Sequence, residues 1–437
     1  MKSRFIAINL NEVNIIWLKK IALKYNLKSI KKILKFNISF TESEKKYQNL
    51  EPWIQWPSYY QGKSFKEHKY FHLGDANLSK SYSIYDWFQD KDKNVLALSP
   101  MNCTFLTNDK SLLIHDPWSP KGVVNGNNNL SHLWEGIRYF INENSINYKF
   151  NFKYLFSIVI GLLKFARLKN YFTYVRLLFF SIFFKWSRAI LLDLFLFDIF
   201  YSLIKTQKYK YSSVFLNAGA HIQHHYLYDS SIYKASGGKY KNPSNYSSFF
   251  TKFLDPLYQI YKIYDLIAYD LLILGKKFNI EITTGLQQIE NPNPYYQYRI
   301  KKYEKFFNLI SVKFAFLEKK MSRDIYIYFS NLDDLKSAEK NLSKFKVNNK
   351  SVFKIWPSKK EKSLFVKFVY RGSIDALKNV TYGDQIWDLT KYVALVSIEN
   401  AIHWPEGWHV NNFHKFTKKT IPLKDLTKEL YGFKKRK

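Results

Sequence analysis

Histidine is concentrated in one segment, Ser212–Tyr228, where an apolar strand-like run ends at Asn217. His221, His224 and His225 follow at positions i, i+3 and i+4, so in a helix their imidazoles share one face. Imidazoles placed in this way can bind one metal ion or one anion. A single histidine is more often just packed or exposed, but three just past a strand predict a functional role.

A second group of histidines lies near the end of the chain, in the aromatic Pro/Gly turn that reads AIHWPEGWH. This turn brings together His403, Glu406 and His409, and His414 follows shortly after. With the first segment, the group holds six of the ten histidines. The clustering predicts one site to which both segments contribute.

Polar residues also follow two other strand-like runs. Arg4–Leu10 ends in Asn11 and Glu12, and Phe278–Thr283 is followed by a polar turn. A strand, a polar turn and then a helix are typical of an α/β unit, in which ligands bind beyond the carboxyl ends of the strands. The alternative makes Asn11 a helix N-cap and Glu12 a first-turn acid. Substrate contacts are expected in the second turn from Thr284 and Gln287.

An aromatic segment, Glu51–Asp75, is interrupted by Pro57 and Gly62, which indicate irregular backbone. Such a segment is more typical of a binding site than of a surface connection. Its aromatic residues are predicted to stack on the sugar or base rings of a substrate: Trp53, Trp56, Tyr59 and Tyr60. Ser58 is the small hydroxyl in the centre of this segment.

Composition narrows the choice of partners. The 437 residues carry a formal net charge of +33, but lysine is spread along the chain together with much Asn, Ile, Phe and Tyr. This is the composition of A/T-rich coding DNA, so nucleic acid is not the expected partner. The charge does predict attraction to anionic partners, including acidic lipids and phosphorylated or acidic glycans. Cys103 is the single cysteine, which excludes an internal disulfide.

The most hydrophobic region, Tyr154–Ile204, is interrupted by charged residues, so no apolar run of about 20 residues is present. We interpret it as two or three buried amphipathic helices, with a peripheral membrane contact by Phe179–Trp186 as the alternative. Phe5–Leu10 is too short for a signal peptide. A cytoplasmic protein, with a place at the inner face of the membrane left open, is therefore expected.

The alternation of strands and helices predicts an α/β fold. The segment 311–371 differs in its sequence pattern from the rest of the chain, because a Lys/Asp-rich helix lies among strand-like runs. This pattern indicates a small α+β insertion. We therefore expect a core formed by 1–300 and 373–437 and an insertion, or cap, at 301–372. The sequence has no P-loop, no GxGxxG after a strand, no CxxC pair and no GxSxG elbow.

Taken in order, these segments resemble a divergent member of the alkaline phosphatase-like superfamily, which includes type I phosphodiesterases, nucleotide pyrophosphatases and sulfatases. The resemblance spans most of the chain and rests on FIAINLNEVN, WPSYYQGKSFKEH, FLNAGAHIQHH, TTGLQQ and AIHWPEGWH. It implies an α/β sandwich with a central, mostly parallel sheet flanked by helices. It also implies two divalent metals beside a Thr or Ser nucleophile.

Carried over residue by residue, the resemblance puts Asn11 or Glu12 in the place of the first-strand Asp ligand. His221 or His225 matches the His of a D-x-x-x-H ligand pair, and Asn217 stands where that pattern has Asp. The late metal-binding His corresponds to His403, and the nucleophile to Ser58.

The departures from the family pattern reduce the metal site. Asn217 replaces an Asp, and Thr283, Thr284 and Gly285 stand in place of an S-D-H-G ligand pair. Neutral Asn and Thr are poor zinc ligands. We expect at most one site, for zinc or manganese, or metal-free chemistry with His224 as general acid or base.

Two functions follow from this interpretation. The first is a hydrolase or transferase that acts on a phosphate or sulfate ester of an anionic small-molecule or glycan-linked substrate in surface-glycan metabolism, with a reduced or altered metal site. Glu406 and His409 are expected to contact that substrate. The alternative is a non-catalytic binding or scaffold protein of the same fold.

Overall fold

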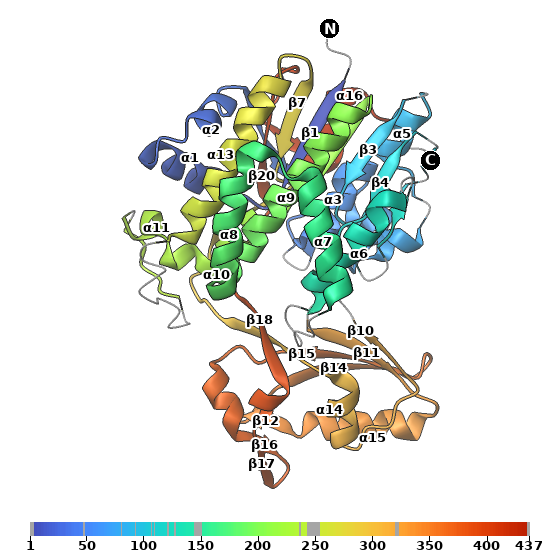
Figure 1. Cartoon of the computed structure of the whole chain (residues 1–437). Coiled ribbons are helices and arrows are strands. Elements are labelled where there is room, and N and C mark those ends of the chain that lie inside the picture. The colour runs from blue at the N-terminus through green and yellow to red at the C-terminus, as the bar shows by residue number, and fades with distance from the viewer. Residues whose placement is uncertain are drawn as a thin grey trace.

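The architecture comes from a computed structural model. It describes residues 4–46, 49–79, 81–91, 93–105, 107–108, 110–119, 122–125, 128–143, 151–235, 237–242, 254–319 and 323–434. The chain forms a larger α/β unit and a smaller α+β unit, joined by two strands (Figure 1).

The larger unit is built on a nine-stranded, mostly parallel sheet. Its strands, in spatial order, are β21 (Thr420–Pro422), β2 (Asn37–Glu42), β20 (Glu406–Asn411), β7 (Asn279–Thr283), β1 (Phe5–Leu10), β6 (Tyr211–Leu216), β3 (Val95–Leu98), β4 (Leu112–Ile114) and β5 (Val124–Asn125). The central strand β1 runs parallel to both β6 and β7. The carboxyl ends of these three strands therefore lie at one edge of the sheet.

Helices cover both faces of this sheet, because its strands are apolar on both sides. Along β1, Ile6, Ile8 and Leu10 pack into one hydrophobic core and Ala7 into another. The first core includes residues of α1 (Ile15–Lys24), α2 (Lys28–Ile33), α6 (Asn128–Glu143), α7 (Phe152–Phe165), α8 (Tyr171–Phe183), α9 (Lys185–Thr206), α10 (Ala218–Tyr226), α11 (Ser231–Ala235) and α13 (Pro256–Leu274). The second includes residues of α3 (Pro52–Gln61), α5 (Ile84–Gln89) and α16 (Leu426–Tyr431). The predicted α/β sandwich is confirmed.

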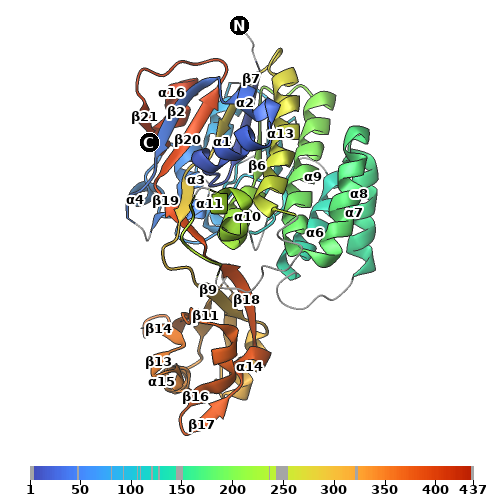
Figure 2. The same cartoon turned by 90° about the vertical axis from the view of Figure 1, so that its left-hand side faces the viewer.

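The smaller unit lies beyond the end of the sheet that is opposite the N-terminus (Figures 1 and 2). It contains β10 (Phe316–Lys319), β11 (Asp324–Tyr328), β12 (Phe345–Val347), β13 (Lys350–Ser351), β14 (Phe353–Ser358), β15 (Ser363–Phe368), β16 (Val380–Tyr382) and β17 (Gln385–Trp387), with α14 (Tyr303–Leu309) and α15 (Leu332–Ser343). The antiparallel strands β9 (Tyr296–Ile300) and β18 (Val393–Ile398) connect it to the sheet. Its own hydrophobic core runs from Tyr298 to Val393, so it extends past the insertion that we expected at 301–372.

Two of the helices predicted to be buried within Tyr154–Ile204 are only half buried. α9 carries most of the buried residues of this region, whereas α7 buries Gly161 and Phe165 and α8 buries Tyr174 and Leu177. The opposite sides of α7 and α8 are apolar and exposed. Among the described residues, no helix is long and apolar enough to cross a membrane.

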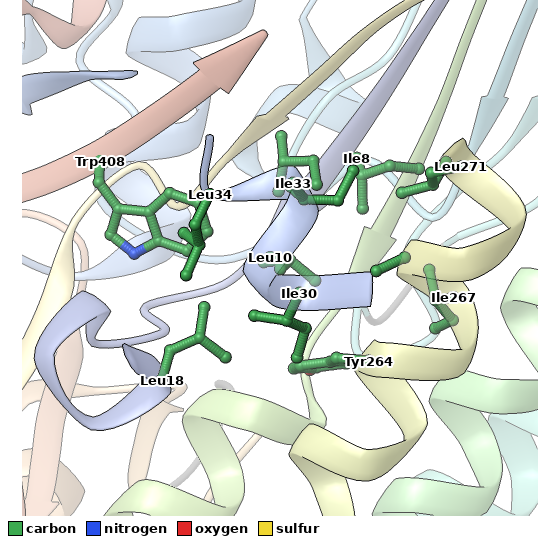
Figure 3. A pocket seen from close by; sticks show the side chains of 12 residues that line it. Ile8, Leu10, Leu18, Ile30, Ile33, Leu34, Tyr264, Ile267, Leu271 and Trp408 are labelled. Carbon is green, nitrogen blue, oxygen red and sulfur yellow. The ribbon is translucent and has the colours of Figure 1, made fainter. Parts of the chain in front are cut away.

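A small apolar cavity lies between β1, α1, α2 and α13 (Figure 3). Two polar groups belong to residues of its lining, and both are satisfied elsewhere: the Tyr264 hydroxyl donates to Asp193, and the Trp408 indole donates to the carbonyl of Val13. A cavity without free polar partners does not hold ordered water. It is therefore part of the main core and not a candidate site.

The contribution of Glu281 on β7 to folding stability is expected to fall as the pH rises. Burial raises the pKa of this carboxyl to about 7. It accepts a hydrogen bond from Tyr59 at 2.7 Å and faces His409, whose pKa burial lowers to about 3. A raised acid pKa contributes stability at low pH, which is lost between the unfolded value near 4.5 and about 7.

The substitution Glu281→Gln isolates this contribution. We expect the variant to equal the wild type in free energy of unfolding near pH 4.5 and to exceed it by about 3 kcal/mol at pH 8. Urea titrations of both proteins across this range measure the difference. A difference that does not change with pH would contradict the assignment to Glu281.

Candidate active site

The site is centred on Glu12, the second residue after β1. Glu12 is buried and has a φ of 57°, which is uncommon for a residue other than glycine and often marks functional sites. Its Oε1 accepts a hydrogen bond from Asn11 Nδ2 at 3.0 Å. Gln288 Nε2 donates to Oε2, and Gln223 Nε2 donates to the Glu12 carbonyl at 2.9 Å. These amides fix the carboxylate at the carboxyl edge of the sheet.

His224 reaches Glu12 from α10, the helix that follows β6. Its Nε2 lies 3.4 Å from Glu12 Oε2. On the other side of the ring, Nδ1 donates to the carbonyl of Ala401 at 2.8 Å and lies 3.1 Å from Glu399 Oε2. Both partners of Nδ1 are acceptors, so this nitrogen carries the ring proton. In the neutral ring the Nε2 lone pair therefore faces Glu12.

His403 reaches the same carboxylate oxygen from β19 (Ala401–Trp404), which pairs with β8 (Gln287–Glu290). Opposite His403 in this ladder is Gln288, so both side chains approach Glu12 from one short two-stranded sheet. His403 Nε2 lies 3.3 Å from Glu12 Oε2, and its Nδ1 lies 3.7 Å from Glu51 Oε2. Each imidazole thus turns Nε2 toward Glu12 and Nδ1 toward a second carboxylate.

The three side chains fit a single divalent metal ion. Within the described residues, Glu12, His224 and His403 form a group whose ligand atoms lie within 4.8 Å of one another. Ligands of a tetrahedral ion at about 2.05 Å are about 3.3 Å apart, close to the distances from Glu12 Oε2 to the two Nε2 atoms. Charge-assisted hydrogen bonds are shorter, about 2.7–2.9 Å. Carboxylates behind both imidazoles are typical of metal-binding histidines.

The electrostatics favour a cation at this position. Burial would raise the pKa of Glu12, but His403 and His224 outweigh it and hold that pKa far below its usual value. Burial would lower the pKa of both histidines, but Glu399 and Glu12 raise that of His224, and Glu12 and Glu51 raise that of His403. The carboxylates around the two imidazoles thus favour positive charge at this position, which either protons on the Nε2 atoms or a bound metal ion would supply.

Three of the predicted site residues, Glu12, His224 and His403, meet in this group. Asn11 and Asn217, both predicted as ligands, lie beside it but use their amides on each other: Asn11 Nδ2 donates to Asn217 Oδ1 at 2.8 Å. Asn11 Oδ1 accepts from the Trp56 indole at 2.8 Å. Asn11 therefore orients Glu12, and the side-chain oxygens of both Asn11 and Asn217 are used in these hydrogen bonds.

His221 and His225, also predicted as metal ligands, lie outside the group. Their rings pack on each other with centroids 4.4 Å apart, and His221 is exposed. In the structure, α10 turns His224 toward Glu12, whereas His221 and His225 point elsewhere. The i, i+3, i+4 spacing thus located the helix but did not identify which imidazole is used.

Ser58, the predicted nucleophile, is buried inside α3 and away from the group. Its Oγ lies 3.1 Å from His68 Nε2, and His68 Nδ1 accepts the backbone N–H of Tyr70 at 3.0 Å. The ring proton of neutral His68 is therefore on Nε2 and points to the Ser58 oxygen. His68 cannot take the Ser58 proton in this arrangement, so the pair holds the segment together.

The predicted aromatic substrate surface lies in the protein core. Trp56, Tyr59 and Tyr60 are fully buried between α3 and the sheet, and only Trp53 is partly exposed. Four further residues predicted to contact substrate have other roles or positions. Thr284 bonds the backbone of Trp408, Gln287 accepts from the N–H of Ile15, His409 is buried beside Glu281, and Glu406 is exposed at the start of β20.

The sequence interpretation missed three residues of the site: Gln288, Glu399 and Glu51. Gln288 and Glu399 support Glu12 and His224, and no local motif identifies them. Glu51 had a usable signal, because an acid directly before Pro52 fits an N-cap followed by a proline at N1. In the structure Glu51 is the N-cap of α3 and is the most open member of the site, with a side chain 38% exposed.

No family model matches the sequence, and no curated protein matches it. Solved structures with similarity to the chain include phosphonoacetate hydrolase from Sinorhizobium meliloti 1021 in complex with phosphonoformate, at 10% identity, TM-score 0.40, and coverage of 97% of this chain and 94% of that one. Human ectonucleotide pyrophosphatase / phosphodiesterase 5 matches at 8% identity and a TM-score of 0.41, with coverage of 99% of this chain and 96% of that one. A mutant of alkaline phosphatase PafA matches at 10% identity and a TM-score of 0.43, with coverage of 98% of this chain and 94% of that one.

At this level of similarity the chemistry of the chain has to be argued from its own residues.

Proposed function

We propose that this chain is a metal-dependent hydrolase or transferase that acts on a phosphate or sulfate ester of an anionic substrate. The observation that carries the proposal is the convergence of Glu12 Oε2 with two imidazole Nε2 atoms, each imidazole having a carboxylate on its Nδ1 side. A divalent ion held by these ligands would polarise a phosphoryl or sulfuryl oxygen and neutralise the charge that develops there.

The catalytic base assigned in this proposal is Glu51. It lies at the exposed side of His403, at the N-terminus of α3, and burial raises the pKa of its carboxyl. A carboxylate of raised pKa accepts a proton more readily than an ordinary one. Glu51 would take the proton of the attacking water or alcohol, and His224 and His403 would stay fixed as ligands.

The anionic character of the substrate follows from the smaller unit. Glu51 is electrostatically coupled to Lys367 on β15, and Lys367 in turn interacts with Arg323 and Arg371. Lys367 pairs with Asp324 at 3.8 Å, but with Arg323 and Arg371 beside it the cations outnumber this acid and favour a substrate with a negative charge beyond the scissile ester. A glycan-linked phosphate or sulfate in surface-polysaccharide metabolism fits this description.

A screen for hydrolysis tests the proposal. The metal-free protein would be reloaded with zinc or manganese and assayed on p-nitrophenyl phosphate, bis-p-nitrophenyl phosphate and p-nitrophenyl sulfate. We expect turnover of at least one ester that depends on added metal and that His221→Ala retains. A protein that binds metal and phosphorylated glycans but hydrolyses none of these esters would favour the alternative, a non-catalytic binding protein of this fold.

A further inference from the structure

The outer side of α7 and α8 is strongly apolar. Phe156 and Leu163 are exposed on α7, and Phe172, Phe179 and Ile182 are exposed on α8. The spacing between neighbouring members of each set is three or seven residues, so each set occupies one helical face. Exposed apolar surface of this extent marks an interaction site in soluble proteins. Both helices lie on the same flank of the molecule, outside α9 (Figures 1 and 2).

A buried ionic network fixes this face outward. Arg167, in the turn between α7 and α8, contacts Asp198 at 2.6 Å and Asp270 at 2.8 Å. Asn170 and Tyr174 also donate to Asp198, at 3.0 Å each. The polar groups of the turn are thus used against α9 and α13, and the apolar residues remain on the solvent side. The packing of the α7–α8 helix pair therefore fixes the apolar face outward, and this face is not the result of loose packing.

The charge of this region identifies the kind of partner. Residues 151–192 contain seven Lys and Arg residues and no Asp or Glu. Lys153, Lys164 and Lys185 are exposed beside the apolar face. An apolar face flanked by cations matches an anionic lipid surface. A second copy of the chain docked through the same face would bring two positively charged regions together, which is unfavourable.

We propose that α7 and α8 dock this protein onto an anionic membrane surface. The helices have 14 and 13 residues and are about 20 Å long, too short to span a hydrocarbon core of about 30 Å. They lie in the interface, with their aromatic and aliphatic side chains in the acyl region and the lysines at the headgroups. Phe179–Trp186, named above as an alternative membrane contact, can contribute only its part before Trp186, because Trp186 is buried.

Vesicle flotation with the full chain tests the proposal. The probes are vesicles of phosphatidylcholine alone and of phosphatidylcholine mixed with phosphatidylglycerol. The variant Leu168→Ser with Phe172→Ser changes side chains that are 81% and 82% exposed. The matched control, Leu23→Ser with Ile386→Ser, changes two that are 71% exposed on α1 and β17.

We expect the wild type and the control to float with the anionic vesicles and the Leu168/Phe172 variant to bind more than about tenfold less. Thermal melts should be unchanged in both variants, because all four side chains lie at the surface. Absence of wild-type binding to anionic vesicles would overturn the proposal. A lipid-free dimer that the Leu168/Phe172 variant dissociates, without vesicle binding, would overturn it in favour of self-association.

Discussion

Replacing His403 by Ala is expected to remove the bound metal and to lower activity by more than about a thousandfold. His403 supplies one of three ligand atoms, and loss of an outer partner alone typically costs about 10- to 100-fold in metal affinity or activity. His224→Ala should behave in the same way, because its Nε2 faces the same carboxylate oxygen. Mass spectrometry of the native protein and titration with zinc and manganese measure the loss.

His221→Ala is the matched control for this prediction. His221 lies on the same helix as His224, but it is exposed and packs on His225. We expect this variant to keep its full metal content and its activity. Equal metal content in His221→Ala, His224→Ala and His403→Ala would show that the ion binds elsewhere, and would remove the basis of the proposed function.

Glu12→Gln separates charge from shape at the same position. The amide keeps the size of the side chain and leaves the left-handed backbone of residue 12 in place. Two neutral imidazoles without a carboxylate form a weaker site for a divalent ion. We expect metal binding to weaken by at least about 100-fold, with the fold retained.

The fold was predictable because its signals are local and repeated. The apolar run that ends at Leu10 and the buried run that ends at Leu216 both became central strands, and the polar residues after them lie at one edge of the sheet. The rule that places ligands beyond the carboxyl ends of strands was enough to indicate Asn11 or Glu12 and the helix with His224. These inferences need only the chain order and the periodicity of each segment.

The finer assignment of the site could not be predicted in this way, because it depends on contacts between distant segments. Glu399 meets His224 across 175 positions of the chain. The aromatic residues of α3 seemed suited to a substrate because of their type, but helical packing against β1 and β6 buries Trp56 and Tyr60. Residue type suggests a role, and only burial decides whether a substrate can reach it.

Replacing Glu51 by Gln is expected to lower the rate of turnover at saturating metal concentration by about 100- to 10,000-fold, the usual contribution of a general base. Glu51 is 3.7 Å from His403 Nδ1 and outside the group of three ligands, so its loss should weaken metal binding by no more than the loss of an outer partner does, about 10- to 100-fold. Glu42→Gln is the matched control, since Glu42 is an exposed acid at the end of β2. It should turn over substrate at the wild-type rate.

A second readout distinguishes a base from a structural acid at this position. Small carboxylic acids such as formate are expected to restore part of the activity of Glu51→Ala, because they can occupy the space of the lost side chain and accept the proton. A merely structural carboxylate would not respond to formate. Turnover in ¹⁸O-labelled water adds a third outcome: label in the Glu51 side chain would contradict general base catalysis and show that the carboxylate itself attacks the ester.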